Sequence, residues 1–306
     1  MRPFFLSDLR TKNWPQHILT VSLVLLAYFL GQFPLLIVLG DQDLLRPETI
    51  DDTRFMAESI GFNTFLALLL VPFILSLILL MASARFILKR SIRSLFTQRK
   101  QLSWKRIAFS FLLWFLLMGT LFVVLSVNSG TVVWNYDPKT FTGLILVSLL
   151  MIPLQTTCEE LLFRGYLLQL SGAVFRKGWL SVLFTGVLFG LIHASNPEVD
   201  KIGDIALLYY IGTGIFLGII TLMDDGIELA MGFHAANNIF AALIVTNDWQ
   251  AFRTDALFLD TAPPSFGWDS ILTLMVLMPL LAICFSRVYR WKEWKRRLFD
   301  QFEPHE

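Results

Sequence analysis

Residues 62–83, FNTFLALLLVPFILSLILLMAS, form an apolar run that contains no charged side chain. An α-helix needs about 20 apolar residues to cross the hydrocarbon core of a bilayer. A run of this length without a charge therefore predicts a membrane-spanning helix. Several further apolar runs along the chain extend this interpretation to a polytopic membrane protein.

The composition of the whole chain agrees with a membrane protein. Of its 306 residues, 55% are hydrophobic and only 16% are charged, and the mean hydropathy is +0.62. Soluble globular proteins carry about 25% charged residues, and disordered chains are poor in apolar ones, so both classes are excluded. The net charge of +1 gives no indication of a nucleic-acid partner. Cys158 and Cys284 lie in apolar runs and are too few for a disulfide framework or a cysteine-rich zinc site.

Eight segments are candidates for spanning helices. They are 18–39, 62–83, 107–127, 141–163, 179–195, 204–222, 227–246 and 270–289. We therefore expect an all-α polytopic membrane protein of about eight transmembrane helices, folded as a single integral membrane domain over residues 1–306. The four middle segments are shorter or carry polar residues, which makes their contents more informative than their ends.

Lysine and arginine are concentrated in alternate connecting segments. Segment 84–106 holds eight of them and the tail after the last span holds five more. The segments 40–61, 128–140, 196–203 and 247–269 hold only five together. Basic residues accumulate in cytoplasmic loops, so we expect an integral protein of a bacterial inner (plasma) membrane with both termini in the cytoplasm. One short segment between the sixth and seventh spans is an exception, because it has two aspartates and no basic residue.

Ionisable side chains inside a span are costly and indicate function. Here they occur in three places: Cys-Glu-Glu-Leu-Leu-Phe-Arg at 158–164, Phe-Gly-Leu-Ile-His at 189–193 and His-Ala-Ala-Asn-Asn at 234–238. The remaining histidines, His17 and His305, lie near the ends of the chain among polar residues. We expect both of these to be solvated.

The charges of the first motif are spaced for an ion pair. Glu160 and Arg164 are four residues apart, so they share one face of a helix and can pair. Pairing lowers the cost of both charges near the apolar core. Glu159 points about 100° away and faces a different neighbour. The alternative is that both glutamates simply mark the water interface at the end of a span.

The three motifs fall at a common depth if their helices are neighbours. At 1.5 Å per residue, Glu159, His193 and His234 lie roughly 16, 21 and 12–16 Å from the cytoplasmic ends of their helices. His234 and Asn238 are four residues apart and share one face. A carboxylate in an apolar site can act as a general base, and histidine and asparagine can stabilise an oxyanion. Glu159, His193 and His234 also suit a catalytic zinc ion.

In order along the chain, the motifs read Glu-Glu-x-x-x-Arg, Phe-x-x-x-His and His-x-x-x-Asn, each in a separate span. This ordered triple resembles the CAAX prenyl protease / bacteriocin-processing family of intramembrane proteases, also called CPBP or Abi. The matching residues are Glu159, Glu160, Arg164, Phe189, His193, His234 and Asn238. The stretch from the first to the last of them is about 80 residues long. They lie in an expected catalytic core at 141–246, and the spans on either side match only in being hydrophobic.

The resemblance implies an intramembrane endopeptidase that acts on membrane-associated proteins or peptides, with its site inside the bilayer and open toward the cytoplasm. By analogy, Glu159 activates water together with His193, and the Glu-Arg pair beside it supports the site. His234 and Asn238 would form the oxyanion pocket. The family's eukaryotic members remove the last three residues of prenylated CAAX proteins, whereas nothing in this sequence indicates a prenyl-binding site.

Two other classes of protein stay open at this point. A catalytically silent scaffold or bacteriocin-immunity protein of the same fold could lose the ionisable residues, all of which are present here. A transporter with a Glu/His proton relay would have inverted repeats, and the sequence shows no such symmetry. The oligomeric state and the substrate are not indicated by any residue pattern.

Two pairs of glycines, Gly186 with Gly190 and Gly214 with Gly218, occur in the fifth and sixth spans. Small residues four positions apart let two membrane helices approach closely. We expect tight packing of these two spans within the chain, with homodimerisation as the rival interpretation.

Overall fold

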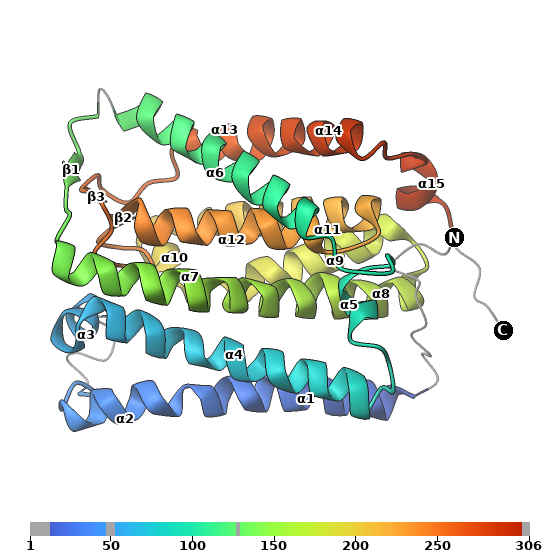
Figure 1. Ribbon diagram of the computed structural model, residues 1–306, viewed down its shortest axis with the longest axis horizontal. Coiled ribbons are helices and arrows are strands. Elements are labelled where there is room, and N and C mark those ends of the chain that lie inside the picture. The colour runs from blue at the N-terminus through green and yellow to red at the C-terminus, as the bar shows by residue number, and fades with distance from the viewer. Residues whose placement is uncertain (1–12, 47–52, 127–128, 302–306) are drawn as a thin grey trace.

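The apolar run 62–83 forms helix α4 (Phe62–Phe86) in the computed structural model (Figure 1). The structure describes residues 13–46, 53–126 and 129–301. The chain is 74% helical, and most of its long helices run roughly along the longest axis of the molecule. An all-α polytopic membrane protein is therefore confirmed.

Besides α4, the helical elements differ widely in length. They are α1 (Trp14–Gly31), α2 (Phe33–Asp41), α3 (Thr53–Ile60), α5 (Arg93–Phe96), α6 (Trp104–Ser126), α7 (Pro138–Glu160), η2 (Leu161–Leu167), α8 (Leu168–Phe175), α9 (Gly178–Leu191), α10 (Pro197–Ile202), α11 (Ala206–Asp224), α12 (Glu228–Leu243), α13 (Trp268–Leu272), η3 (Thr273–Leu277), α14 (Met278–Val288) and α15 (Trp294–Phe299). The segments η2 and η3 are π-helical.

The expected number of eight spanning helices is wrong. Within the described residues, six helical segments are long and apolar enough to cross a membrane: Trp14–Asp41, Phe62–Phe86, Trp104–Ser126, Pro138–Phe175, Ala206–Asp224 and Trp268–Val288. The fifth expected span is the 14-residue helix α9, which is about 21 Å long. The seventh is the 16-residue helix α12, about 24 Å long. Both fall short of the roughly 30 Å hydrocarbon core. α12 contains the third motif, and α9 ends two residues before the histidine of the second motif.

The fourth expected span belongs to a helical rod of 38 residues, Pro138–Phe175, which joins α7, η2 and α8. Its length is about 57 Å, so the rod extends well beyond the expected end at residue 163. Glu159 and Glu160 consequently lie in the middle third of the rod. The alternative that they merely mark the end of a span is not supported.

The connecting segments separate to the two ends of the molecule (Figure 1). At one end lie α3, α10 and a small sheet of β1 (Val132–Trp134), β3 (Phe258–Asp260) and β2 (Val245–Asn247), in that order. β1 pairs antiparallel with β3, and β2 pairs parallel with it. At the other end lie the start of α1 and the helices α5 and α15. The basic and acidic connections thus lie at opposite ends, as their alternation predicts, while the side of the membrane that each end faces stays a prediction.

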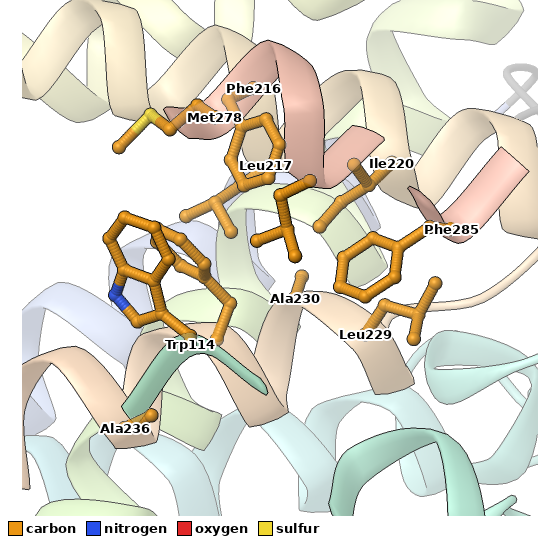
Figure 2. Packing of buried hydrophobic residues seen from close by; sticks show 11 residues of the cluster. Trp114, Phe216, Leu217, Ile220, Leu229, Ala230, Ala236, Met278 and Phe285 are labelled. Carbon is orange, nitrogen blue, oxygen red and sulfur yellow. The ribbon is translucent and has the colours of Figure 1, made fainter. Parts of the chain in front are cut away.

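A large apolar cluster joins four helices around α12 (Figure 2). Trp114 of α6 and Phe233 of α12 are both buried, with ring centroids 4.4 Å apart. Phe216 of α11 packs on Phe233, with ring centroids 5.0 Å apart, and Phe285 of α14 lies across the cluster from Trp114 (Figure 2). This packing surrounds the short helix α12 with protein and so positions the third motif.

Close packing of α9 against α11 depends on the glycines predicted for this role. A methyl group added at Gly214 would stand 2.7 Å from the carbonyl oxygen of Gly186, and one added at Gly186 would stand 2.8 Å from the backbone nitrogen of Ile215. A methyl group at Gly190 would likewise collide with the side chain of Ile211. The two helices therefore touch backbone to backbone, which supports packing within the chain.

The prediction that His17 is solvated is wrong. Its side chain is only 3% exposed, and its Nδ1 lies 2.9 Å from the hydroxyl of Tyr166 in η2. The first turn of α1 packs against the helical rod Pro138–Phe175, and this contact buries His17. His305 lies outside the described residues.

Replacing Gly214 by alanine tests the packing of α9 against α11. We expect a lower melting temperature of the purified protein in detergent, because overpacking of this kind costs about 1–3 kcal/mol. Gly119→Ala is the matched control: it adds the same methyl group within α6, where the nearest atom is a side-chain carbon of Phe240 at 3.8 Å. Equal melting temperatures of the two variants would contradict the close approach.

Candidate active site

The long rod carries two glutamates and an arginine into the interior of the helix bundle. Glu160 and Arg164 are 0% exposed, and Glu159 is 6% exposed. The backbone changes from α-helix to π-helix directly after Glu160. Such π-helical insertions are frequent at functional sites, and this one contains Arg164 of the first motif.

The ion pair predicted from the sequence spacing is present. Nη1 of Arg164 donates to Oε1 of Glu160 at 2.8 Å. Its Nη2 donates to the carbonyl oxygen of Gly214 in α11 at 3.2 Å. The guanidinium also lies over the ring of Phe189, 4.3 Å from its centroid. Arg164 thus connects the rod to both α9 and α11.

His234 of α12 lies against both glutamates. Its Nδ1 is 2.7 Å from Oε1 of Glu160, the same oxygen that accepts from Arg164. Its Nε2 is 3.4 Å from Oε2 of Glu159. Because Nδ1 donates to a carboxylate, a neutral His234 ring presents its lone pair at Nε2, toward Glu159.

His193 lies two residues beyond the end of α9 and is fixed by its own helix. Its Nδ1–H donates to the carbonyl oxygen of Phe189 at 2.7 Å, so a neutral ring has its lone pair at Nε2. The ring of Phe189 packs between the two histidines, with centroids 4.8 Å from His193 and 5.9 Å from His234. No hydrogen bond joins His193 to Glu159 in the described structure, and Phe189 is the residue that connects His193 to His234.

Asn238 is placed by a residue that the motifs do not include. Its Nδ2 donates to Oε1 of Gln155 at 3.1 Å, and its Oδ1 accepts from Asn237 at 3.3 Å. Gln155 is buried one helical turn before Glu159. A polar amide inside a span, four residues before the glutamate, was a sequence signal that could have identified it.

Tyr210 of α11 is a second residue that the sequence motifs miss. Its ring stacks on His193, with centroids 4.2 Å apart and planes at 18°. Its hydroxyl donates to Oε1 of Glu198 at 3.0 Å and accepts from Asn196 at 3.3 Å. Burial raises the pKa of the Glu198 carboxyl. No periodicity or spacing connects Tyr210 to His193, so only the fold reveals this contact.

The zinc alternative requires three protein ligands that point at one position. In the described part of the chain, no group of three His, Cys, Asp or Glu side chains is arranged to hold a metal ion. His234 directs one nitrogen to each glutamate, and His193 directs Nδ1 to a backbone carbonyl. These hydrogen bonds at Nδ1 orient the two rings without using Nε2 as a donor, so the zinc ligand set Glu159, His193 and His234 stays a prediction.

Comparison with known proteins agrees with the motifs. Residues 140–240 match the family described as Rce1-like, type II CAAX prenyl endopeptidase. This part of the chain is therefore similar to that family. The match encloses all three motifs and confirms the resemblance seen in the sequence.

A curated protein similar to this chain is the "Uncharacterized protein YyaK" of Bacillus subtilis. The two sequences are 31% identical over 196 residues, which is 63% of this chain and 66% of the relative. The chain thus spans slightly less than two thirds of that relative's length. No solved structure is significantly similar to the chain.

Replacing Arg164 tests the buried pair. We expect Arg164→Ala to lower the melting temperature in detergent more than Arg164→Lys, because breaking a buried ion pair costs about 3–5 kcal/mol. Lysine keeps the positive charge but lacks the planar guanidinium that can donate two hydrogen bonds to one carboxylate. Adding Glu160→Gln to Arg164→Ala removes the stranded charge and should recover part of the loss. Strictly additive losses in the double variant would mean that the two side chains are not coupled.

Proposed function

We propose that this Rce1-like chain is an intramembrane endopeptidase that hydrolyses peptide bonds of membrane-associated proteins or peptides. The observation that supports the proposal most strongly is the placement of Glu159 and Glu160 on the two nitrogens of one buried histidine, His234. A carboxylate beside an oriented imidazole is the arrangement required for general-base activation of water. Its position in the rod puts this chemistry inside the helix bundle.

In the proposed reaction, Glu159 is the general base. A water molecule gives one proton to its carboxylate while the water oxygen bonds to the scissile carbonyl carbon. The carbonyl oxygen becomes an oxyanion, the C–N bond then breaks, and the proton passes from Glu159 to the leaving nitrogen. Oε2 of Glu159 is buried without a hydrogen bond in the described structure, which leaves it able to accept one from water.

The neighbouring side chains have supporting roles in this proposal. His193 presents Nε2 as an acceptor and helps to orient the water, since its Nδ1 is occupied. His234 donates to the oxyanion when its Nε2 carries a proton, and Asn238 completes the oxyanion pocket. Donors held in advance in a site of low polarity stabilise a developing charge strongly. Glu160 and Arg164 hold His234 in position.

The proposed reaction uses Glu159 as the base and needs no metal ion. A zinc-dependent reaction makes a different prediction: a strong chelator would abolish cleavage and added zinc would restore it. For the Glu159 reaction, we expect cleavage by the purified protein to persist in the chelator. Loss and zinc-dependent recovery of activity would assign the chain to the metalloproteases instead.

The second candidate function is a catalytically silent scaffold or bacteriocin-immunity protein of the same family. In such a protein, the buried Glu160–Arg164 pair would serve the fold alone, and the Glu159 carboxylate would be dispensable. The two functions therefore differ in what happens when Glu159 is changed without disturbing the pair.

Glu159→Gln separates the two functions. We expect the rate of peptide cleavage to fall by about 10²–10⁴, because a positioned general base is lost while its shape is kept. The assay uses purified protein in lipid vesicles with two probes, a farnesylated CAAX peptide and an unmodified membrane-spanning peptide, and mass spectrometry of the products. Glu58→Gln, an exposed change in α3, is the control and should leave the rate unchanged. Near-normal turnover by Glu159→Gln would rule out Glu159 as the base.

Reporter fusions test the proposed orientation in the membrane. Fusions after Arg90 or after Lys295 should report the cytoplasm, and fusions within 250–265 should report the outer side. The expectation follows from the separation of basic and acidic connections to opposite ends of the bundle. A cytoplasmic signal from 250–265 would contradict this orientation and the proposed cytoplasmic opening of the site.

A further inference from the structure

A cavity far from the glutamates opens at the basic end of the bundle. Its volume is about 320 Å³. The lining includes five cationic side chains, Arg99, Arg106, Arg290, Lys292 and Arg297, but only two acidic ones, Asp224 and Asp225. These residues come from the loop before α6 with the first turn of α6, from the end of α11 and from the tail after α14, so the fold brings three separate segments together.

Three of the arginines are already matched by acidic partners. Asp224 pairs with Arg99 at 2.6 Å and with Arg106 at 3.0 Å. Asp225 pairs with Arg297 at 2.8 Å, and Arg99 also pairs with Glu228. This explains why an acidic segment lies among basic ones: its carboxylates are neutralised within the protein.

The remaining two cations, Arg290 and Lys292, are exposed. In the described structure neither has an acidic partner. The turn that carries them is bounded by two non-glycine residues in the left-handed conformation, Arg290 (φ 55°) and Glu293 (φ 60°). The rim of the cavity therefore presents two uncompensated positive charges on a tightly turned segment.

The cavity lies at the end of a candidate membrane-spanning segment, Trp268–Val288. Its lining includes Tyr289, the residue directly after the end of α14. Trp291 donates its indole N–H to Asp224 at 3.0 Å and lies 5.8 Å from Trp294 between ring centroids. Tryptophan and tyrosine are enriched at the membrane–water interface, and the ring of Tyr289 lies under the guanidinium of Arg106 at 4.1 Å.

We propose that this cavity binds the phosphate headgroup of an anionic phospholipid. Basic pockets between membrane helices bind acidic headgroups, and arginine suits phosphate because of its planar fork of donors. The paired arginines form the floor, and Arg290 and Lys292 reach the phosphate from the rim. The site is separate from the proposed peptidase centre and does not depend on it.

The test is a lipid titration of the purified full-length protein, followed by native mass spectrometry. Phosphatidylglycerol is the probe, and phosphatidylcholine is the zwitterionic reference. Changing Arg290 and Lys292 together to glutamine should weaken binding of the first phosphatidylglycerol about 25-fold, since each cation near the surface contributes a factor of about five. Phosphatidylcholine should bind weakly to both proteins.

The matched control changes Arg287 and Lys295 to glutamine, which removes the same charge from exposed positions that do not line the cavity. It should leave binding within about threefold of wild type, and an equal loss in both double variants would overturn the proposal. Asp225→Asn frees Arg297 in a backbone position that asparagine tolerates, and should tighten binding. Inorganic phosphate should compete only weakly, and competition as effective as that of the lipid would overturn the lipid assignment.

Discussion

One oxygen atom, Oε1 of Glu160, accepts hydrogen bonds from both Arg164 and His234. A carboxylate at 0% exposure is tolerable in an apolar bundle only when its charge is paired. Here Oε1 makes both contacts, while Oε2 of Glu160 is buried without a hydrogen bond in the described structure. The pairing therefore fixes the rod against α12, which carries His234. The same contact turns Nε2 of His234 toward Glu159. The geometry of the site therefore follows from how the charge of Glu160 is compensated.

The same arginine connects the centre to the tightly packed pair α9 and α11. Its second donor reaches the carbonyl oxygen of Gly214, which is accessible because glycines allow these two helices to touch. Phe189 lies beneath the guanidinium and beside both histidines. The close packing of α9 against α11 and the position of Arg164 therefore both depend on Gly214. A methyl group at this position would disturb both.

The sequence was most informative where a local rule applies. Charge-free runs predicted a polytopic helical protein, the spacing of Glu160 and Arg164 predicted their pair, and the alternation of basic segments predicted two distinct ends. It was least informative where distant segments decide the outcome. The number of spanning helices was wrong because α9 and α12 are shorter than the apolar runs that contain them. For α12, which other helices enclose, a sequence does not distinguish an apolar surface buried in protein from one buried in lipid. The burial of His17 and the stacking of Tyr210 on His193 depend on contacts between distant segments of the chain, which no spacing encodes.

Glu159 is proposed to act on peptide bonds inside the membrane, and the most direct test compares membrane peptides in living cells. Quantitative mass spectrometry of membrane fractions would compare cells that carry the wild-type chain with cells that carry Glu159→Gln at equal protein level. The account predicts that at least one membrane protein accumulates uncut in the variant, and that its cleavage fragment, present in the wild type, disappears. Identical sets of membrane peptides in the two strains would contradict it.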